Sequence, residues 1–193
     1  MKKSYFAFLF TLFAFVFANA QKANEYIEYY ANGQVMLQGF KTSAVTRTGE
    51  WTWFYANGNT LRNGTYNEKG YKIGIWTDYF EDGNVQNVEY VTGSGENKAY
   101  YDNGRLYYSV AVVEGVKQGE YKEFFSNGKP KMTGAYKDNE LDGNVVWWYE
   151  NGYKEMEGTL KEGKREGKWV YYYRSNGNKG SEGQYKQDKE DGS

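Results

Sequence analysis

The chain contains no cysteine and no histidine, and it has a single proline. Without these side chains it has no disulfide, no thiol nucleophile and no imidazole base, and it lacks the commonest zinc ligands. Paired carboxylates such as Glu120 and Glu123 would suit a glycosidase, but their odd spacing puts them on opposite faces of a strand. We therefore expect no enzyme, no catalytic residue, no metal and no cofactor.

Charge of either sign is not in excess, because 24 basic residues face 25 acidic ones. This balance gives no broad attraction to nucleic acid or to an anionic membrane. The densest basic stretch, residues 161–168, also carries Glu162 and Glu166, which indicates a solvated loop. We expect neither nucleic-acid binding nor strong membrane binding.

The N-terminal segment has the pattern of a secretory signal peptide. Lys2 and Lys3 precede an apolar run over residues 5–17, and Ala18-Asn19-Ala20 has the small-x-small form of a cleavage site. A helix of that length rises only about 20 Å, less than the ~30 Å hydrocarbon core of a bilayer. We predict a signal peptide over residues 1–20 and an exported domain over 21–193, in the periplasm, on the cell surface or outside the cell. Gln21 stands where a lipoprotein would need cysteine, so we expect no lipid anchor.

Seven copies of one unit fill the remaining sequence. Each has a turn dipeptide, at Asn32-Gly33, Asn57-Gly58, Asp82-Gly83, Asn103-Gly104, Asn127-Gly128, Asn151-Gly152 and Asn176-Gly177, at intervals of 25, 25, 21, 24, 24 and 25 residues. An aromatic pair such as Trp148-Tyr149 precedes nearly every dipeptide. Such a constant period is the signature of a repeat architecture, in which each unit packs on its neighbours.

Each unit is expected to be a β-hairpin. Aromatic residues make up 20% of the chain, which favours strands, and Asn-Gly favours a type I′ turn. Half a period away we expect a second, five-residue turn, as over residues 163–167. The predicted fold is all-β: an elongated antiparallel meander of about seven stacked β-hairpin repeats of 21–25 residues, forming a single twisted sheet.

Alternation along the strands predicts an aromatic ladder on one face of this sheet. We name eight of its residues as a candidate contact surface, with packing of the fold itself as the competing interpretation: Trp51, Trp53, Trp76, Tyr121, Trp147, Tyr149, Trp169 and Tyr171. Glycines of the partner strands, such as Gly134 and Gly158, are expected where a neighbouring ring lies flat.

One hairpin departs from the pattern. The 21-residue interval has Glu89 where a glycine is expected and Asn97 where a tryptophan is expected, with Gly93-Ser94-Gly95 between them. Two interpretations are open: a kink that shapes a binding surface, or drift in a tolerant repeat.

The unit formed by Gly167, Trp169, residues 171–173, Asn176-Gly177, Gly183 and Tyr185 resembles the bacterial variant of the MORN repeat, the membrane occupation and recognition nexus. The resemblance extends over roughly residues 26–192. It implies a scaffold or binding surface without catalysis of its own. Many bacterial proteins with this repeat are labelled antitoxins, in the family named YwqK, although a signal peptide would move such a role from the cytosol to the periplasm.

We therefore expect a secreted, non-catalytic module that binds another protein at the cell envelope. Two alternatives stay open: an antitoxin or immunity protein that neutralises a partner toxin, and a protein that binds an envelope glycan through its aromatic ladder.

Overall fold

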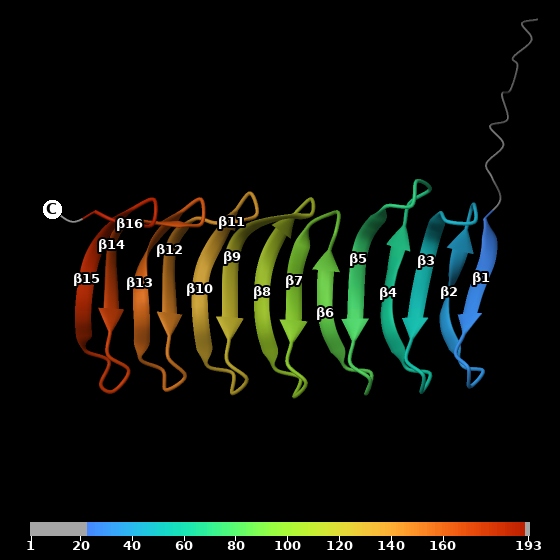
Figure 1. The fold of residues 1–193 in the computed structure, drawn as a ribbon, viewed down its shortest axis with the longest axis horizontal. Helices are drawn as coiled ribbons and strands as arrows, with labels where there is room; N and C mark the ends of the chain where they lie inside the picture. The colour runs from blue at the N-terminus through green and yellow to red at the C-terminus, as the bar shows by residue number, and fades with distance from the viewer. Residues whose placement is uncertain (1–22, 192–193) are drawn as a thin grey trace, which may run out of the picture.

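The computed structural model describes residues 23–191, so the predicted signal peptide over residues 1–20 lies outside the described part. The described residues form one antiparallel sheet of 16 strands (Figure 1). The strands are β1 (Asn24–Tyr29), β2 (Val35–Lys41), β3 (Arg47–Phe54), β4 (Thr60–Tyr66), β5 (Lys72–Tyr79), β6 (Val85–Tyr90), β7 (Gly95–Tyr100), β8 (Leu106–Val113), β9 (Val116–Phe124), β10 (Pro130–Lys137), β11 (Glu140–Leu141), β12 (Gly143–Trp148), β13 (Lys154–Lys161), β14 (Lys164–Tyr172), β15 (Lys179–Lys186) and β16 (Lys189–Glu190).

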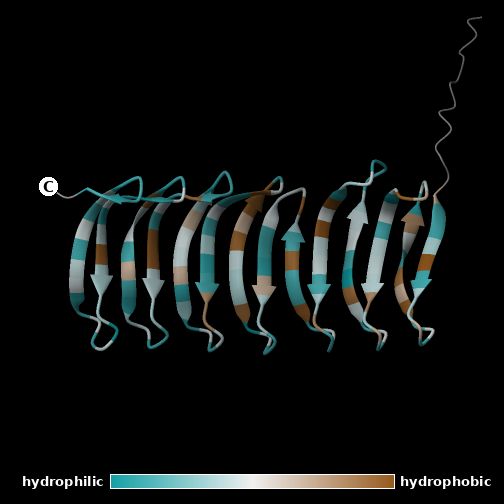
Figure 2. Cartoon of the chain, in the orientation of Figure 1, coloured by the Kyte–Doolittle hydropathy of each residue, from teal (hydrophilic) through white to brown (hydrophobic). Residues whose placement is uncertain are grey.

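The strands follow one another in sequence order across the sheet. The one local exception is that β10 pairs with both β11 and β12, which together act as one strand interrupted at Asp142. Apolar and polar residues alternate along the strands, as Figure 2 shows. The predicted all-β meander of stacked hairpins is therefore confirmed.

The Asn-Gly dipeptides form the turns along the lower edge of Figure 1, but not as type I′ turns. In the first, only Gly33 has a positive φ, of 85°, and its N–H donates to the carbonyl of Tyr30 at 2.9 Å. The Asn32 side chain accepts a hydrogen bond from the N–H of Gln34 at 3.1 Å. This is a type I turn followed by a left-handed glycine and a bulge, so the predicted turn type was wrong.

The type I′ geometry occurs at the opposite edge instead. Two adjacent residues with positive φ join the strands there at Glu114-Gly115, Asp138-Asn139, Glu162-Gly163 and Gln187-Asp188. The five-residue connections predicted over residues 115–119, 139–143 and 163–167 were therefore wrong. The glycine expected to close each connection, such as Gly119 or Gly167, lies inside the next strand instead. Its φ of 101° or 70° marks a local irregularity of that strand.

Hydrogen bonds tie most of the lower turns to the next one. The hydroxyl of Tyr30 donates to the carbonyl of Phe54 at 2.7 Å, and the same bond recurs from Tyr55, Tyr101 and Tyr149 to the following repeat. The side-chain amide of Asn32 likewise donates to the carbonyl of Ala56 at 3.2 Å. The second aromatic residue of the pair and the asparagine of the turn therefore have lateral roles that the sequence pattern did not reveal.

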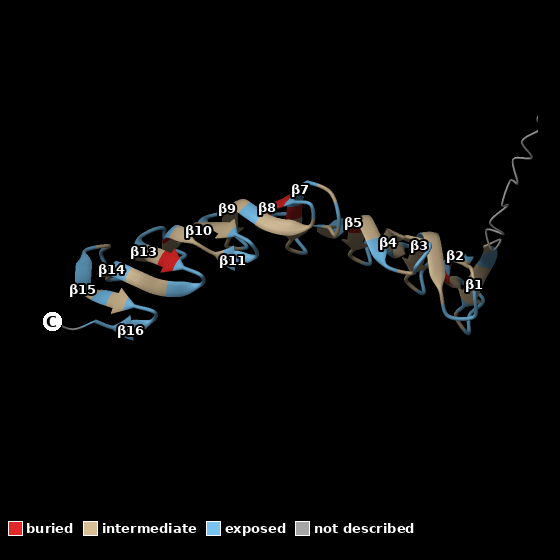
Figure 3. Ribbon diagram, turned by 90° about the horizontal axis from the view of Figure 1, so that it is seen from above, coloured by how far each residue is buried: buried red, intermediate tan, exposed pale blue. Residues whose placement is uncertain are grey.

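The core is a single layer of rings lying on glycines. A Cβ added to Gly39, Gly64 or Gly158 would overlap the ring of Trp51, Trp76 or Trp169 from the adjacent strand. These three tryptophans are among the few buried side chains, whereas most residues are half-buried or exposed (Figure 3). The predicted close approach of a ring to a glycine is confirmed at Gly158, whereas at Gly134 it was wrong, because the side chain nearest to that glycine is Val145.

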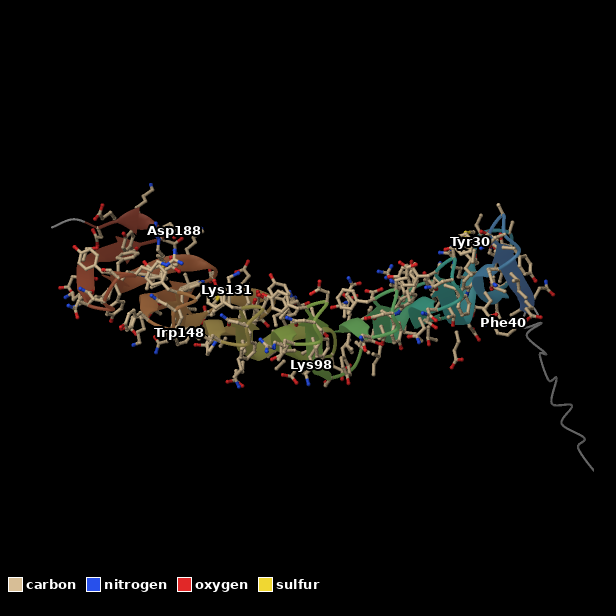
Figure 4. The ribbon with its side chains drawn as sticks, turned by 90° about the horizontal axis from the view of Figure 1, so that it is seen from below. Tyr30, Phe40, Lys98, Lys131, Trp148 and Asp188 are labelled. Carbon is tan, nitrogen blue, oxygen red and sulfur yellow. The ribbon has the colours of Figure 1, made fainter. Side chains whose placement is uncertain are left out.

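The sheet is curved, and the ladder lies on its concave face. Viewed along the direction of its strands, the sheet follows an arc (Figures 3 and 4). Figure 4 shows Tyr30, Lys131 and Asp188 on the inner side of this arc, and Phe40, Lys98 and Trp148 on the outer side. The cross-strand pair of Met132 and Trp147 shares the inner face, which we call the concave face; the other is the convex face.

The ring-on-glycine contact gives a test of the core. We expect Gly158→Ala to lower the free energy of unfolding by about 1–3 kcal/mol, because the added methyl group must displace the Trp169 ring. Chemical denaturation followed by circular dichroism measures this change. Gly183→Ala is the matched control: Gly183 pairs with Trp169 from the other side, but the atom nearest to its added Cβ belongs to Tyr185, at 3.3 Å, and not to the Trp169 ring. Equal effects of the two substitutions would contradict the proposed packing.

Candidate binding surface

The structure divides the eight ladder residues by burial. Trp51, Trp76 and Trp169 are 1%, 3% and 1% exposed, so their rings serve the packing of the sheet. The other five are half-buried, with part of each ring open on the sheet: Trp53, Tyr121, Trp147, Tyr149 and Tyr171. Only this second group has ring surface to offer a ligand.

The ladder consists of two aromatic clusters rather than one continuous stripe. In the first, Trp53 lies 5.8 Å from both Trp51 and Trp76, measured between ring centroids. In the second, Trp147 lies 5.9 Å from Trp169. Between the clusters, strands β6 and β7 present polar or small residues to the concave face, namely Asn87, Glu89, Asn97 and Ala99.

The substitution of tryptophan by Asn97 has a structural explanation. The Asn97 side chain is 9% exposed, and it accepts a hydrogen bond from the N–H of Tyr90 at 2.7 Å. The ring of Tyr90 then covers Gly95, so the ring comes from strand β6 instead of β7. The irregular hairpin thus keeps the contact of a ring with a glycine. Here the ring lies on the earlier strand and the glycine on the later one, the reverse of the order at the three buried tryptophans.

Cations lie over the rings along the upper margin of the concave face. Lys41 Nζ lies 3.2 Å from the ring centroid of Tyr26, and Arg47 Cζ lies 4.8 Å from that of Trp51. Similar contacts join Lys72 to Trp76, Lys117 to Tyr136 and Arg165 to Tyr185. The sequence analysis missed them, although Arg47, Lys72, Lys117 and Arg165 each stand four positions before the leading ring of a hairpin.

The carboxylates considered as a glycosidase pair are held in separate ion pairs. Glu123 pairs with Lys131 at 2.8 Å and accepts a hydrogen bond from the Tyr121 hydroxyl at 3.3 Å. Glu120 pairs with Lys122 at 2.8 Å. Three positions separate the two carboxylates along one strand, so they project from opposite faces and share no substrate position.

The hollows in the described surface are open rather than enclosed. One of about 530 Å³ lies near the upper edge, between the ends of β10 and β14, and its lining includes Asp138, Glu140 and Asp142. Within residues 23–191, no three acidic side chains come together in a way that could hold a metal ion. In the same residues, no helix is long and apolar enough to cross a membrane.

These features define a repeat protein of stacked β-hairpins with a curved, partly aromatic face. Residues 24–40, 47–68 and 117–138 match the family model of the MORN repeat variant, and each segment covers one hairpin. The resemblance to the MORN repeat variant is therefore confirmed at three of the repeats. Such repeats suggest a repeat-based binding module. A search of the curated proteins finds no match.

Mutation of a half-buried ring tests whether that ring packs in the sheet or is available to a ligand. We expect Trp147→Ala to lower the free energy of unfolding by about 3 kcal/mol, because the ring packs on Trp169 and pairs with Met156 across the sheet. Urea denaturation gives the value, and Tyr71→Ala is the control because Tyr71 is 68% exposed. A loss below ~0.5 kcal/mol at Trp147 would indicate a ring that does not pack and is available to a ligand.

Tyrosines on the concave face predict sensitivity to alkali. Burial raises the pKa of Tyr121, with a further contribution from Glu123, and burial likewise raises the pKa of Tyr108 and Tyr136. A raised pKa in the fold stabilises the neutral phenol, so this contribution is complete below about pH 10 and is lost as the pH rises above it. We expect the melting temperature to fall above that pH. Tyr121→Phe should reduce the fall, and an unchanged pH dependence would contradict the assignment.

Proposed function

We propose that this protein is a non-catalytic, exported scaffold that binds another protein at the cell envelope through its concave face. The observation that carries the proposal is the long, curved face itself, with five half-buried rings between charged side chains. This face does not have the enclosed pocket or the converging polar groups of a small-molecule site.

The size of the face is sufficient for a stable complex. Fifteen strands follow one another across the sheet, and at about 4.8 Å per strand they give a width of roughly 70 Å. Strands of six to nine residues are about 20–30 Å long. Even half of such a face exceeds the ~800 Å² that each partner buries in a standard interface.

The pattern at residues 1–20 supports export, and Gln21 in place of cysteine argues against a lipid anchor. We therefore propose a place in the periplasm, on the cell surface or outside the cell.

A second candidate is an antitoxin or immunity protein, which is itself a protein-binding role. The resemblance to the MORN repeat variant favours it, because bacterial proteins with this repeat often carry that label. A third candidate, glycan binding, is supported by the open ring surface of Trp53, Trp147 and Tyr171. A toxin encoded in the adjacent gene would favour the second candidate.

Photocrosslinking tests the proposed face. A benzoylphenylalanine replacing Glu89, which is exposed on the concave face, should capture a specific protein from the native envelope. The same group replacing Lys98, in the same hairpin but on the convex face, is the control. Capture only from position 98, or no capture from position 89, would contradict the proposal. Recovery of the captured complex from the cytosol alone would contradict export.

A further inference from the structure

Two cations face each other across neighbouring strands near the N-terminal end of the concave face. Lys41 and Arg47 are cross-strand partners in β2 and β3. Like charges directly opposite each other destabilise a sheet. The two cations lie over Tyr26 and Trp51, so the rings hold them in place without neutralising them.

Within residues 23–191, no carboxylate forms an ion pair with Lys41, Arg47 or Lys72. Of the acidic side chains on this part of the face, Glu28 is engaged by the Tyr26 hydroxyl and Asp78 by the Arg62 guanidinium. Glu89, opposite Trp76 on β6, forms no ion pair with these three cations. Lys72, which is exposed and lies 4.2 Å from the Trp76 ring centroid, adds a third cation in the next repeat. We call Lys41, Arg47 and Lys72 the basic margin.

The rings beneath the basic margin point to the kind of partner. Trp51 and Trp76 are 1% and 3% exposed, so they offer no open surface on which a sugar could stack. What remains accessible are the charged groups themselves. Arg47 is held between three rings, with its Cζ 5.5 Å from Trp53 and 6.0 Å from Tyr66. A guanidinium fixed in this way is suited to bind a carboxylate through two hydrogen bonds.

The spacing of the cations favours an extended chain. Arg47 and Lys72 begin strands that are two positions apart in the sheet, a separation of about 9.6 Å. A polyproline II helix advances about 9.3 Å in three residues, so acidic residues at every third position lie on one side at nearly this interval. A partner of this kind would place one carboxylate opposite the Lys41–Arg47 pair and the next opposite Lys72.

We propose that the basic margin is the docking site for an extended acidic segment of a partner protein, with one carboxylate at the Lys41–Arg47 pair and the next opposite Lys72. This inference rests on the proposed protein-binding function and names the chemistry of the partner. The charge of the margin supplies the attraction, and the rings keep the cations oriented before the partner arrives.

Fluorescence anisotropy with a labelled peptide of Glu-Pro-Pro triplets tests the site on the whole exported chain. We expect salt-dependent binding that Arg47→Gln and Lys72→Gln each weaken by about fivefold. Lys98→Gln and Lys122→Gln, on the convex face, are the matched controls and should leave the affinity unchanged. Thermal melting of every variant confirms that it is folded, and the exposed Lys72 keeps the test valid if Arg47→Gln does not fold.

Three results would overturn the inference: no binding of the peptide at low salt, binding by the Arg47 and Lys72 variants that equals that of the wild type, or tighter binding of a uronic-acid polymer than of the peptide. The crosslinking experiment from position 89 separates this failure from failure of the proposed function. If Arg47→Gln still captures the envelope partner at the wild-type level, the acidic docking site is wrong and the scaffold function stands. If the wild-type chain captures no partner, the scaffold function itself fails.

Discussion

The contact of a large ring with a glycine on the adjacent strand is the constraint on which this sheet depends. A single-layer sheet has no second layer to bury its apolar residues, so each tryptophan must be covered by its neighbours within the layer. Trp51, Trp76 and Trp169 reach nearly complete burial because the strand beside each of them carries a glycine. At Gly134 the partner is Val145, with its Cγ1 only 2.9 Å from an added Cβ, so the close approach persists where the ring is replaced. A lone hairpin could not provide this cover, which is why the unit is repeated.

The same packing shapes the electrostatics of the concave face. Side chains that stand over a buried ring have their apolar stems against the sheet and their charges in water. Lys41, Arg47 and Lys72 are therefore oriented by the core rather than by carboxylate partners, whereas Arg62 and Lys131 are neutralised by Asp78 and Glu123. One packing layer thus provides both the stability of the sheet and the arrangement of charge that a partner would meet.

Much of the fold could be predicted from the sequence, because period and alternation are properties of residue order alone. The interval between turn dipeptides gave the meander, and the alternation around Trp51 gave the ladder. The turn types could not be predicted, because Asn-Gly is compatible with turns that contain one left-handed residue and also with turns that contain two. Glu114 and Glu162 adopt positive φ although glutamate rarely does, with φ of 50° and 51°. Nor could the basic margin be predicted, because Arg47 contacts rings of its own strand and of strand β4, a proximity that exists only once the register is set.

The lateral hydrogen bonds along the lower turns have a mechanical consequence. These staples join neighbouring turns along one edge of the sheet in the described chain, except between the third and fourth turns. At Phe125, which also lacks a hydroxyl, Asn127 and Lys129 bond to Glu150 instead. Phe80 has no hydroxyl and Asp82 has no amide donor, so both staples are missing between the third and fourth turns. The pairing of β6 with β7 is also reduced there to Asn87 with Ala99 and Val88 with Lys98. Bending under load should therefore concentrate at this joint, between two parts of the sheet that are held more firmly.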